Sequence, residues 1–303
     1  MRVAILGTGA LGCVFAGRLS GHVETWMLGS WAESVAAVRG RGVRVEEPDG
    51  TTRVGRVLAS DDPAAVPSSE VALILVKSYQ TERAAAWASR VLAPTGLAVT
   101  LQNGLDNASK LTAALGEDRV AQGVTYAGAT LLGPGSARFV ASLPTFVDAR
   151  VARPGLLADF VSLLNSAGLE AHATDAIEGR LWGKAVANAA INPLSALWRV
   201  PNGEVCAGVA RRKVMAWLAK EASRVARARC VTLPFDDAVA YVESVCHATA
   251  ENRSSMLQDV EHGRPTEIDS INGVIVTEAG RLGMPVPYNE MVWQLVRGIT
   301  APQ

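Results

Sequence analysis

The sequence predicts an α/β protein whose N-terminal part is a doubly wound parallel sheet and whose C-terminal part is all-α. Three observations predict this class. A glycine-rich loop at residues 7–12 follows directly on a short apolar run. Apolar runs and segments of helical length then alternate up to about residue 174, which is typical of a parallel sheet with helices on both faces. From residue 175 to residue 303, helical periodicity dominates.

Residues 1–174 are expected to form the sheet domain. Its strands are the apolar runs at residues 2–6, 23–28, 71–76, 97–101 and 170–174, with shorter β segments between residues 120 and 147. Its helices are expected at residues 10–19, 81–92 and 154–167. A further helix should begin at Ser30-Trp31-Ala32-Glu33, which has the spacing of a capping box with Ser30 as the N-cap. A hairpin around Asp49-Gly50 would join residues 43–45 to residues 51–58.

Residues 175–303 are expected to form the helical domain. Its helices are predicted at residues 176–198, 205–229, 236–258 and 267–282. Pro193 lies inside the first of them, where its missing N–H should kink or interrupt the helix. Thr266 has the character of an N-cap, so Glu267 would be the first residue of the last helix.

Composition limits the classes of function. The chain has 303 residues, enough for two domains, and its formal net charge is zero. This balance gives no reason to expect binding to nucleic acid or to a membrane surface. The four cysteines lack CxxC or zinc-like spacing, so reduced thiols are expected and no metal site is predicted. No signal peptide or membrane span is recognised, and a cytoplasmic protein is expected.

The loop Gly7-Thr8-Gly9-Ala10-Leu11-Gly12 matches the G-x-G-x-x-G pattern of a Rossmann dinucleotide site. The first glycine permits a tight turn, the second leaves room for a pyrophosphate, and the third lets the helix pack closely on the strand. Open N–H groups at the helix N-terminus favour an anion. The loop therefore predicts binding of a nicotinamide dinucleotide.

The residues after the second strand bear on the choice of dinucleotide. NAD sites typically have Asp or Glu about 20 residues beyond the glycine loop, but this chain has Gly29 and Ser30 there. The missing acid favours NADP. The arginine expected of a 2′-phosphate site is missing too, although Ser30 at a helix N-terminus could present N–H groups to a phosphate. NADP (as NADPH) is therefore predicted, and NAD is kept as the alternative.

Lys184, Asn188 and Asn192 are spaced at i, i+4 and i+8, so a helix would place them on one face. A solvated face would carry mixed charges and long polar side chains, whereas alanines fill the space between these three. We interpret the stripe as part of a substrate site. Glu267 taken alone is interpreted as an ordinary acidic residue at a helix N-terminus without a functional role, because the helix dipole favours a carboxylate there.

Seven segments, in order over nearly the whole chain, carry a family resemblance. They are GTGALG, VKSYQ, QNGLDN, RLWGKAVANAAINPLSALW, PNGE, ENRSSMLQD and PTEIDSINGVIV. Together they resemble the ketopantoate reductase (2-dehydropantoate 2-reductase) family. The resemblance implies NADPH-dependent reduction of ketopantoate to pantoate, in pantothenate and coenzyme A biosynthesis. It also implies a Rossmann domain followed by a helical domain.

The resemblance further implies roles for individual residues. Lys184 would be the general acid that protonates the carbonyl oxygen. Glu267 would bind the substrate's hydroxyl and orient Lys184, which replaces the helix-start interpretation. Lys77 and Asn103 would lie near the nicotinamide end of the cofactor, and Asn103 would also meet the substrate. The other substrate contacts implied by the resemblance are Asn188, Asn192, Asn202 and Ser255. This chain departs from many members at Ser30, where they have an arginine.

Two other functions are kept open. The first is a reductase of another 2-oxo acid on the same fold. The second is a non-catalytic NADP(H)-binding sensor, which would be free to lose Lys184 or Glu267, whereas both are present. The expected partner is a small-molecule 2-oxo acid, and the chain is expected to be a monomer or a homodimer.

Overall fold

The computed structural model describes residues 1–300, and it divides into two compact units. Unit 1 comprises Met1–Gln102 and Asn107–Ile177, and unit 2 comprises Asn103–Asp106 and the chain from Glu178 onward. The sequence placed the boundary at residue 174. It also placed Asn103–Asp106 in the first domain, whereas the contacts of these four residues assign them to unit 2.

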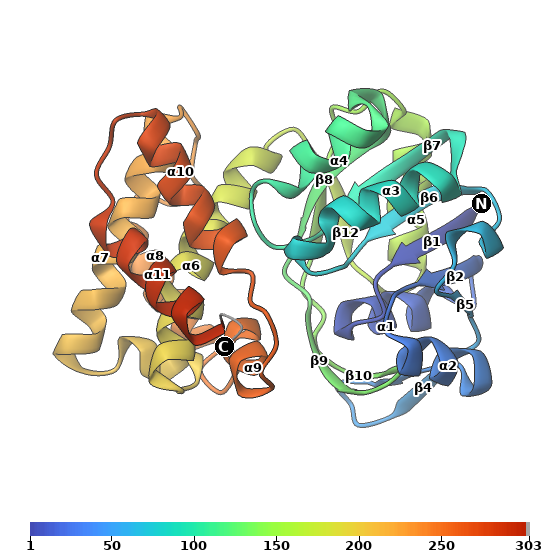
Figure 1. Cartoon of the computed structure of the whole chain (residues 1–303), viewed down its shortest axis with the longest axis horizontal. Coiled ribbons are helices and arrows are strands. Elements are labelled where there is room, and N and C mark those ends of the chain that lie inside the picture. Colours follow the sequence, from blue (N-terminus) through green and yellow to red (C-terminus); the bar gives the residue numbers. More distant parts are fainter. Residues whose placement is uncertain (301–303) are drawn as a thin grey trace. The chain divides into compact units, whose positions relative to one another are not determined.

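Unit 1 is built on an eight-stranded sheet with the order β12-β11-β8-β7-β6-β1-β2-β5 (Figure 1). The strands are β1 (Arg2–Leu6), β2 (Glu24–Leu28), β5 (Leu58–Ser60), β6 (Ser69–Ile74), β7 (Leu92–Thr100), β8 (Val120–Thr125), β11 (Thr145–Asp148) and β12 (Ala171–Thr174). In this order, neighbouring strands from β8 to β5 all pair in parallel. Strand β11 pairs antiparallel with β8, and β12 pairs in parallel with β11. The order β5-β2-β1-β6-β7-β8 is that of a doubly wound dinucleotide-binding sheet, which confirms the predicted fold class.

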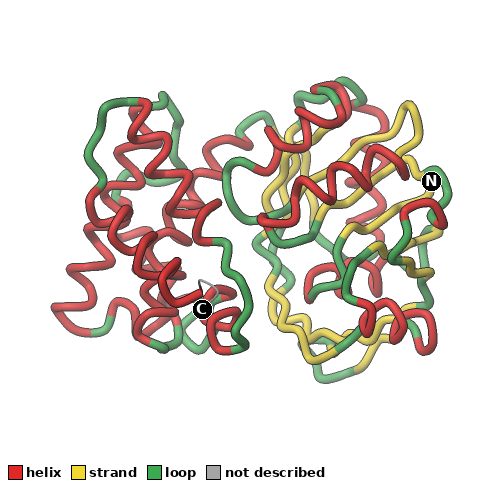
Figure 2. Tube along the Cα trace, viewed as in Figure 1, coloured by secondary structure: helices red, strands yellow, loops and turns green. Residues whose placement is uncertain are grey.

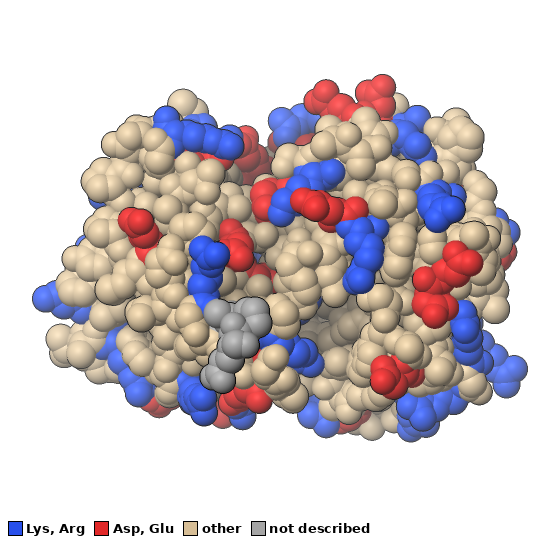
Figure 3. All heavy atoms as spheres, viewed as in Figure 1, with Lys and Arg blue, Asp and Glu red and all other residues tan. Residues whose placement is uncertain are grey.

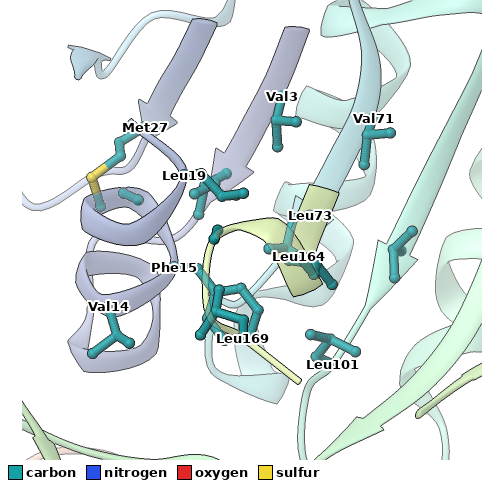
Figure 4. Close-up of a cluster of buried hydrophobic side chains, with 14 of the residues drawn as sticks. Val3, Val14, Phe15, Leu19, Met27, Val71, Leu73, Leu101, Leu164 and Leu169 are labelled. Atoms are coloured by element: carbon teal, nitrogen blue, oxygen red, sulfur yellow. The ribbon is translucent and has the colours of Figure 1, made fainter. Parts of the chain in front are cut away.

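Helices cover both faces of this sheet because successive strand residues point in opposite directions. The helices are α1 (Ala10–Leu19), α2 (Ala32–Arg41), α3 (Thr81–Val91), α4 (Asn107–Leu115) and α5 (Pro154–Ser166). Val3 and Ile5 of β1 pack into a core with α1 and α5, whereas Ala4 and Leu6 pack with α3 and α4. Figure 4 shows the first of these cores, which includes Phe15 of α1 and Leu164 of α5. This packing fixes the N-terminus of α1 at the carboxyl edge of the sheet.

A second, four-stranded sheet has the order β4-β3-β10-β9. Its strands are β3 (Val43–Glu46), β4 (Thr52–Gly55), β9 (Gly128–Gly133) and β10 (Ser136–Ala141). The predicted hairpin is confirmed, because β3 and β4 pair antiparallel around Asp49-Gly50. The sequence did not predict that β10 would pair with β3 in parallel and so extend the hairpin into a sheet.

The predicted capping box is wrong. Helix α2 begins at Ala32, its N-cap is Trp31, and no side chain caps it. The N–H of Gly29 bonds to the carbonyl of Ser60, which extends the pairing of β2 with β5 past Leu28. The chain therefore turns at Ser30, and the helix starts one residue later than the capping-box spacing requires.

Unit 2 is all-α, as predicted, and Figure 2 shows it as helices joined by loops. The helices are α6 (Ile177–Trp198), α7 (Gly208–Ala228), α8 (Ala238–Ala248), α9 (Ser255–Glu261), α10 (Val274–Arg281) and α11 (Pro287–Thr300), with a 3₁₀ turn at Asn202–Cys206 and a π-helical turn at Asp269–Gly273. The predicted helix at residues 236–258 is two helices, α8 and α9, and α11 was not among the predicted elements.

Three local predictions in unit 2 are corrected. Helix α6 is continuous through Pro193, so of the two predicted effects, a kink or an interruption, the interruption is wrong. Thr266 is not an N-cap, because its buried Oγ1 has no hydrogen-bond partner among the described residues. Glu267 precedes the helical residues, and its carbonyl accepts the N–H groups of Ser270 and Ile271, each at 3.1 Å. The backbone of Glu267 therefore starts the turn that Thr266 was expected to cap.

The surface carries charges of both signs. On the face shown in Figure 3, basic and acidic side chains are interspersed, in keeping with the formal net charge of zero. Among the described residues, no helix has the length and apolar character needed to cross a membrane.

Candidate functional site

The glycine loop in unit 1 has the geometry that its spacing requires. Gly7 has φ +132°, and a Cβ atom on it would lie 2.8 Å from the carbonyl carbon of Leu75. A Cβ atom on Gly12 would lie 2.1 Å from the carbonyl oxygen of Gly7. Gly7 also donates its N–H to the carbonyl of Leu28 at 2.8 Å, which anchors the turn to β2. The turn and the close packing of α1 on β1 therefore both depend on glycine.

Gly9 is different, because it faces open space. Apart from Gly9 itself and its neighbours along the chain, no heavy atom of the described residues lies within 4 Å of the position that a Cβ atom on Gly9 would take. Gly9 is the N-cap of α1, and no side chain caps the N–H groups of that helix. An anion placed here would meet open N–H groups and the positive end of the helix dipole. The loop can therefore hold a diphosphate at Gly9.

The end of β2 lies beside this loop. Ser30 is exposed, and a Cβ atom on Gly29 would collide with the side chain of Thr8. Arg39 donates to the carbonyl of Ala59 at 2.8 Å and pairs with Asp61 at 3.3 Å. The guanidinium of Arg39 is therefore held at the end of β5, and an acid lies next to it.

The loops after β6 and β7 are joined by a buried amide that the sequence analysis left without a role. Gln102 donates from Nε2 to the carbonyl of Val76 and to Oγ1 of Thr81, each at 2.9 Å. Its Oε1 accepts from the hydroxyl of Thr100 at 2.9 Å. These bonds fix the chain on both sides of Lys77, which follows β6 at the carboxyl edge of the sheet. In the sequence, a glutamine directly after an apolar strand is the feature that could have indicated this role.

The polar stripe of unit 2 lies on α6. Lys184 and Asn188 are half-buried and Asn192 is buried, and the alanines between them belong to the helical core. The stripe is therefore not a solvated face. A substrate site on this face stays a prediction.

Glu267 lies close to this stripe. The residue is 5% exposed, and its Oε2 accepts from Nδ2 of Asn103 at 3.4 Å. Burial lowers the pKa of Lys184 to about 8, and the carboxylate of Glu267 acts in the opposite direction. The structure thus brings together Lys184, Glu267 and Asn103, three of the residues implied by the family resemblance.

Ser255 and Asn202 belong to two other segments of unit 2. Ser255 is the exposed first residue of α9. Its neighbour Ser254 is buried, caps α9 through the N–H of Leu257, and lies 2.8 Å from the hydroxyl of Ser195 on α6. Asn202 donates its side-chain amide to Oγ1 of Thr249 at 3.0 Å and so stabilises the turn after α8.

The chemistry available to Lys184 follows from these neighbours. An ammonium whose pKa is about 8 is largely protonated at neutral pH and gives up its proton readily. The carboxylate beside it stabilises the charged form. Asn103 and Asn188 offer amide groups that can donate to a carbonyl or carboxylate oxygen. The cluster is suited to protonating an oxygen that gains negative charge.

Comparisons with known proteins agree with this chemistry. Residues 3–150 match the family model "Ketopantoate reductase PanE/ApbA", and residues 176–300 match "Ketopantoate reductase PanE/ApbA C terminal". The 2-dehydropantoate 2-reductase of Halobacterium salinarum is 34% identical over 299 residues, with 98% of each chain covered.

Solved structures extend the likeness to the fold. A PanE/ApbA family ketopantoate reductase from Ralstonia eutropha JMP134 is 34% identical, with a TM-score of 0.91 and coverage of 99% of this chain and 98% of that one. D-mandelate dehydrogenase, solved with NADH and anilino(oxo)acetate, has a TM-score of 0.92 at 24% identity, over 99% of this chain and 98% of that one. At 24% identity, the similarity to D-mandelate dehydrogenase supports the fold alone. On the sequence matches and the family models, the chain belongs to the ketopantoate reductase family of oxidoreductases.

Proposed function

We propose that this protein catalyses the NADPH-dependent reduction of 2-dehydropantoate (ketopantoate) to pantoate, a step of pantothenate and coenzyme A biosynthesis. The observation that carries the proposal is the pairing of Lys184, whose pKa is lowered by burial, with the buried carboxylate of Glu267. Membership of the family supports the choice of substrate, because relatives at 34% identity are named 2-dehydropantoate 2-reductases. A cytoplasmic location and a monomeric or homodimeric state remain predictions.

In the proposed reaction, a bound nicotinamide supplies the hydride that reduces the ketone carbon. Lys184 donates its Nζ proton to the ketone oxygen as negative charge develops there. Glu267 keeps Lys184 protonated and accepts a hydrogen bond from the substrate's hydroxyl. We assign the substrate's remaining polar contacts to Asn103, Asn188, Asn192, Asn202 and Ser255.

The open site at Gly9 fits a dinucleotide pyrophosphate, with the backbone of Gly7-Thr8-Gly9-Ala10-Leu11-Gly12 around it. Ser30 would lie toward the adenosine ribose, and Lys77 toward the nicotinamide end. Arg39 is bonded at Ala59 and Asp61, and Arg41 donates to the carbonyl of Pro134. We propose that NADPH is the cofactor, because no acid directly follows β2. Because both arginines are engaged in this way and do not select for a 2′-phosphate, we propose that NADH is also accepted.

The test is steady-state reduction of ketopantoate with NADPH and with NADH, in the wild type and in Lys184→Ala. Loss of the general acid should lower turnover by about 10²- to 10⁴-fold. The dissociation constant of NADPH, measured by fluorescence titration, should stay near the wild-type value. Lys220→Ala, which removes an exposed lysine from α7, is the matched control and should retain full turnover.

A panel of other 2-oxo acids separates the alternatives. Turnover of another acid in the absence of ketopantoate turnover would replace the proposed substrate. NADPH binding without oxidation by any acid of the panel would instead identify a sensor. Normal turnover in Lys184→Ala would remove that residue from the mechanism.

A further inference from the structure

Helix α6 contains a backbone carbonyl that the helix itself cannot satisfy. In an α-helix, the carbonyl of residue i accepts the N–H of residue i+4. The residue four positions after Ala189 is Pro193, which has no N–H. Helix α6 nevertheless continues through Pro193 to Trp198. The carbonyl of Ala189 therefore needs a donor from another part of the chain, since an unpaired buried carbonyl is costly.

The side chain of Asn272 supplies that donor. Its Nδ2 lies 3.0 Å from the carbonyl oxygen of Ala189, and the residue is fully buried. Asn272 belongs to the π-helical turn Asp269–Gly273, which begins two residues after Glu267. Ala189 follows Asn188 and lies five residues after Lys184. One hydrogen bond thus ties the segment that carries Glu267 to the helix that carries Lys184.

Asn272 is itself held in place by two further helices. Its Nδ2 also donates to Oδ1 of Asn289 at 3.0 Å. Asn289 donates from Nδ2 to the carbonyl of Leu218 at 3.2 Å and to the carboxylate of Glu221 at 2.9 Å. Both N–H groups of Asn272 are therefore used, one toward α6 and one toward α11. A side chain with both donors engaged has one orientation, so the link to Ala189 is rigid.

We propose that Asn272 is a positioning residue for the reaction: by holding the π-helical turn against the carbonyl left open by Pro193, it sets the placement of Glu267 relative to Lys184. This inference rests on the proposed roles of Lys184 and Glu267. A π-helical turn inserts one residue into the helical ladder, and such turns are frequent at functional sites. Here the turn gives the chain after Glu267 the register at which Asn272 reaches α6.

The competing explanation is that Asn272 only satisfies a buried carbonyl and has no influence on the chemistry. Pro193→Ala separates the two explanations, because it gives α6 the missing N–H and removes the need for a donor. In the double variant Asn272→Ala/Pro193→Ala, the carbonyl is satisfied again, but the tether between the turn and α6 is absent. This variant is also expected to be more stable than Asn272→Ala, and it carries the comparison if Asn272→Ala alone does not fold.

The experiment compares the wild type with Pro193→Ala, Asn272→Ala and the double variant. The readouts are kcat and KM, the pH profile of kcat/KM, the melting temperature, and the titration of Lys184 by NMR in the protein without substrate. Pro193→Ala should match the wild type in its pH profile of kcat/KM. The double variant should regain part of the melting temperature lost in Asn272→Ala, because the carbonyl of Ala189 is satisfied again whereas Oδ1 of Asn289 is not. Its kcat should stay about 10- to 100-fold below that of the wild type.

The titration of Lys184 gives the second expected result. The carboxylate of Glu267 raises the pKa of Lys184 in the wild type. A displaced Glu267 raises it less, so both variants that lack Asn272 should titrate at lower pH. Asn272→Gln, which keeps both N–H groups, should recover part of the difference.

Two outcomes overturn the inference. One is a double variant that regains wild-type kcat and titration together with part of its melting temperature. The other is an Asn272→Ala variant that loses only thermal stability. Failure of the proposed function would look different, because a wild type without ketopantoate turnover would still report the effect of Asn272 on the NMR titration of Lys184.

Discussion

At the scale of single residues, the balance between burial and charge at Lys184 determines how the reaction should respond to pH. Burial lowers the pKa of Lys184 to about 8, and Glu267 opposes this effect. If Lys184 is the general acid, kcat/KM should be level below pH 8 and fall about tenfold per pH unit above it, as the lysine loses its proton. Glu267→Gln removes the opposing charge, so its residual activity should fall from a lower pH.

The matched control for this profile is Lys184→Arg. An arginine stays protonated throughout the range in which the lysine titrates. Any activity that remains in Lys184→Arg should therefore show no decline near pH 8. A decline at the same pH in both proteins would assign the titration to another group.

Gly9 and Gly12 allow the two roles of the glycine loop to be separated. Gly12→Ala places a Cβ atom 2.1 Å from the carbonyl oxygen of Gly7, so the backbone must move and the melting temperature should fall. Gly9→Ala should leave the melting temperature unchanged, because in residues 1–300 its added Cβ atom meets no atom within 4 Å beyond its chain neighbours. It should still weaken NADPH binding, because the methyl group occupies space proposed for the pyrophosphate. A thermal shift assay and a binding titration on both variants check this pair.

At the scale of elements, the sequence was informative where a pattern is local. The strand, loop and helix around Gly7 and Gly12 follow from hydrophobic spacing and from contacts within a few residues. In two places, distant chain segments decide the outcome. Pro193 is tolerated because Asn272, from the π-helical turn, serves the carbonyl that the proline leaves open. Ser30 does not cap α2 because the pairing with β5 extends to Gly29.

The break between α8 and α9 has a similar cause. The predicted helix at residues 236–258 has continuous helical periodicity, but the chain turns after Ala248. In this turn, the carbonyls of Ala250 and Asn252 accept the N–H groups of Gly203 and Asn202. These bonds come from a segment about fifty residues earlier, which the periodicity of the helix does not report. The family motifs, in contrast, singled out Lys184, Glu267 and Asn103, which lie close together in the structure although they are distant in the sequence.

The start of α11 offers a test at this scale. The carboxylate of Glu221 on α7 accepts the N–H groups of Tyr288 at 3.1 Å and Asn289 at 2.9 Å. A buried charge at a helix N-terminus is stabilised by the dipole and by these bonds. Glu221→Gln should therefore lower the free energy of unfolding by about 1–3 kcal/mol. Hydrogen exchange should show the largest loss of protection in the first turn of α11.

The control for this variant is Glu290→Gln. Glu290 lies in the first turn of the same helix but is exposed. It should change the free energy of unfolding by a few tenths of a kcal/mol at most, because exposed charges are screened by solvent. Equal effects of the two variants in urea denaturation would contradict the assigned role of Glu221.

At the scale of the whole molecule, the choice of dinucleotide should be visible in stability. A ligand that binds only the folded protein adds about 2.7 kcal/mol at a concentration of one hundred times its dissociation constant. NADPH and NADH should therefore both raise the midpoint of thermal unfolding when each is present at the same multiple of its own constant. Gly9→Ala should need more of either nucleotide for the same shift. An unchanged midpoint at saturating NADPH would contradict the proposed binding site at the glycine loop.

The short segment Asn103–Asp106 has a consequence for recombination between related genes. Its four residues belong to unit 2, while the residues on either side belong to unit 1, so the chain changes unit three times. A single crossover near residue 177 would give a chimaera whose Asn103 comes from one parent and whose Glu267 comes from the other. The hydrogen bond between these two residues would then join parts that had not been selected together. We expect chimaeras that also exchange residues 103–106 to retain activity more often than those with the single crossover.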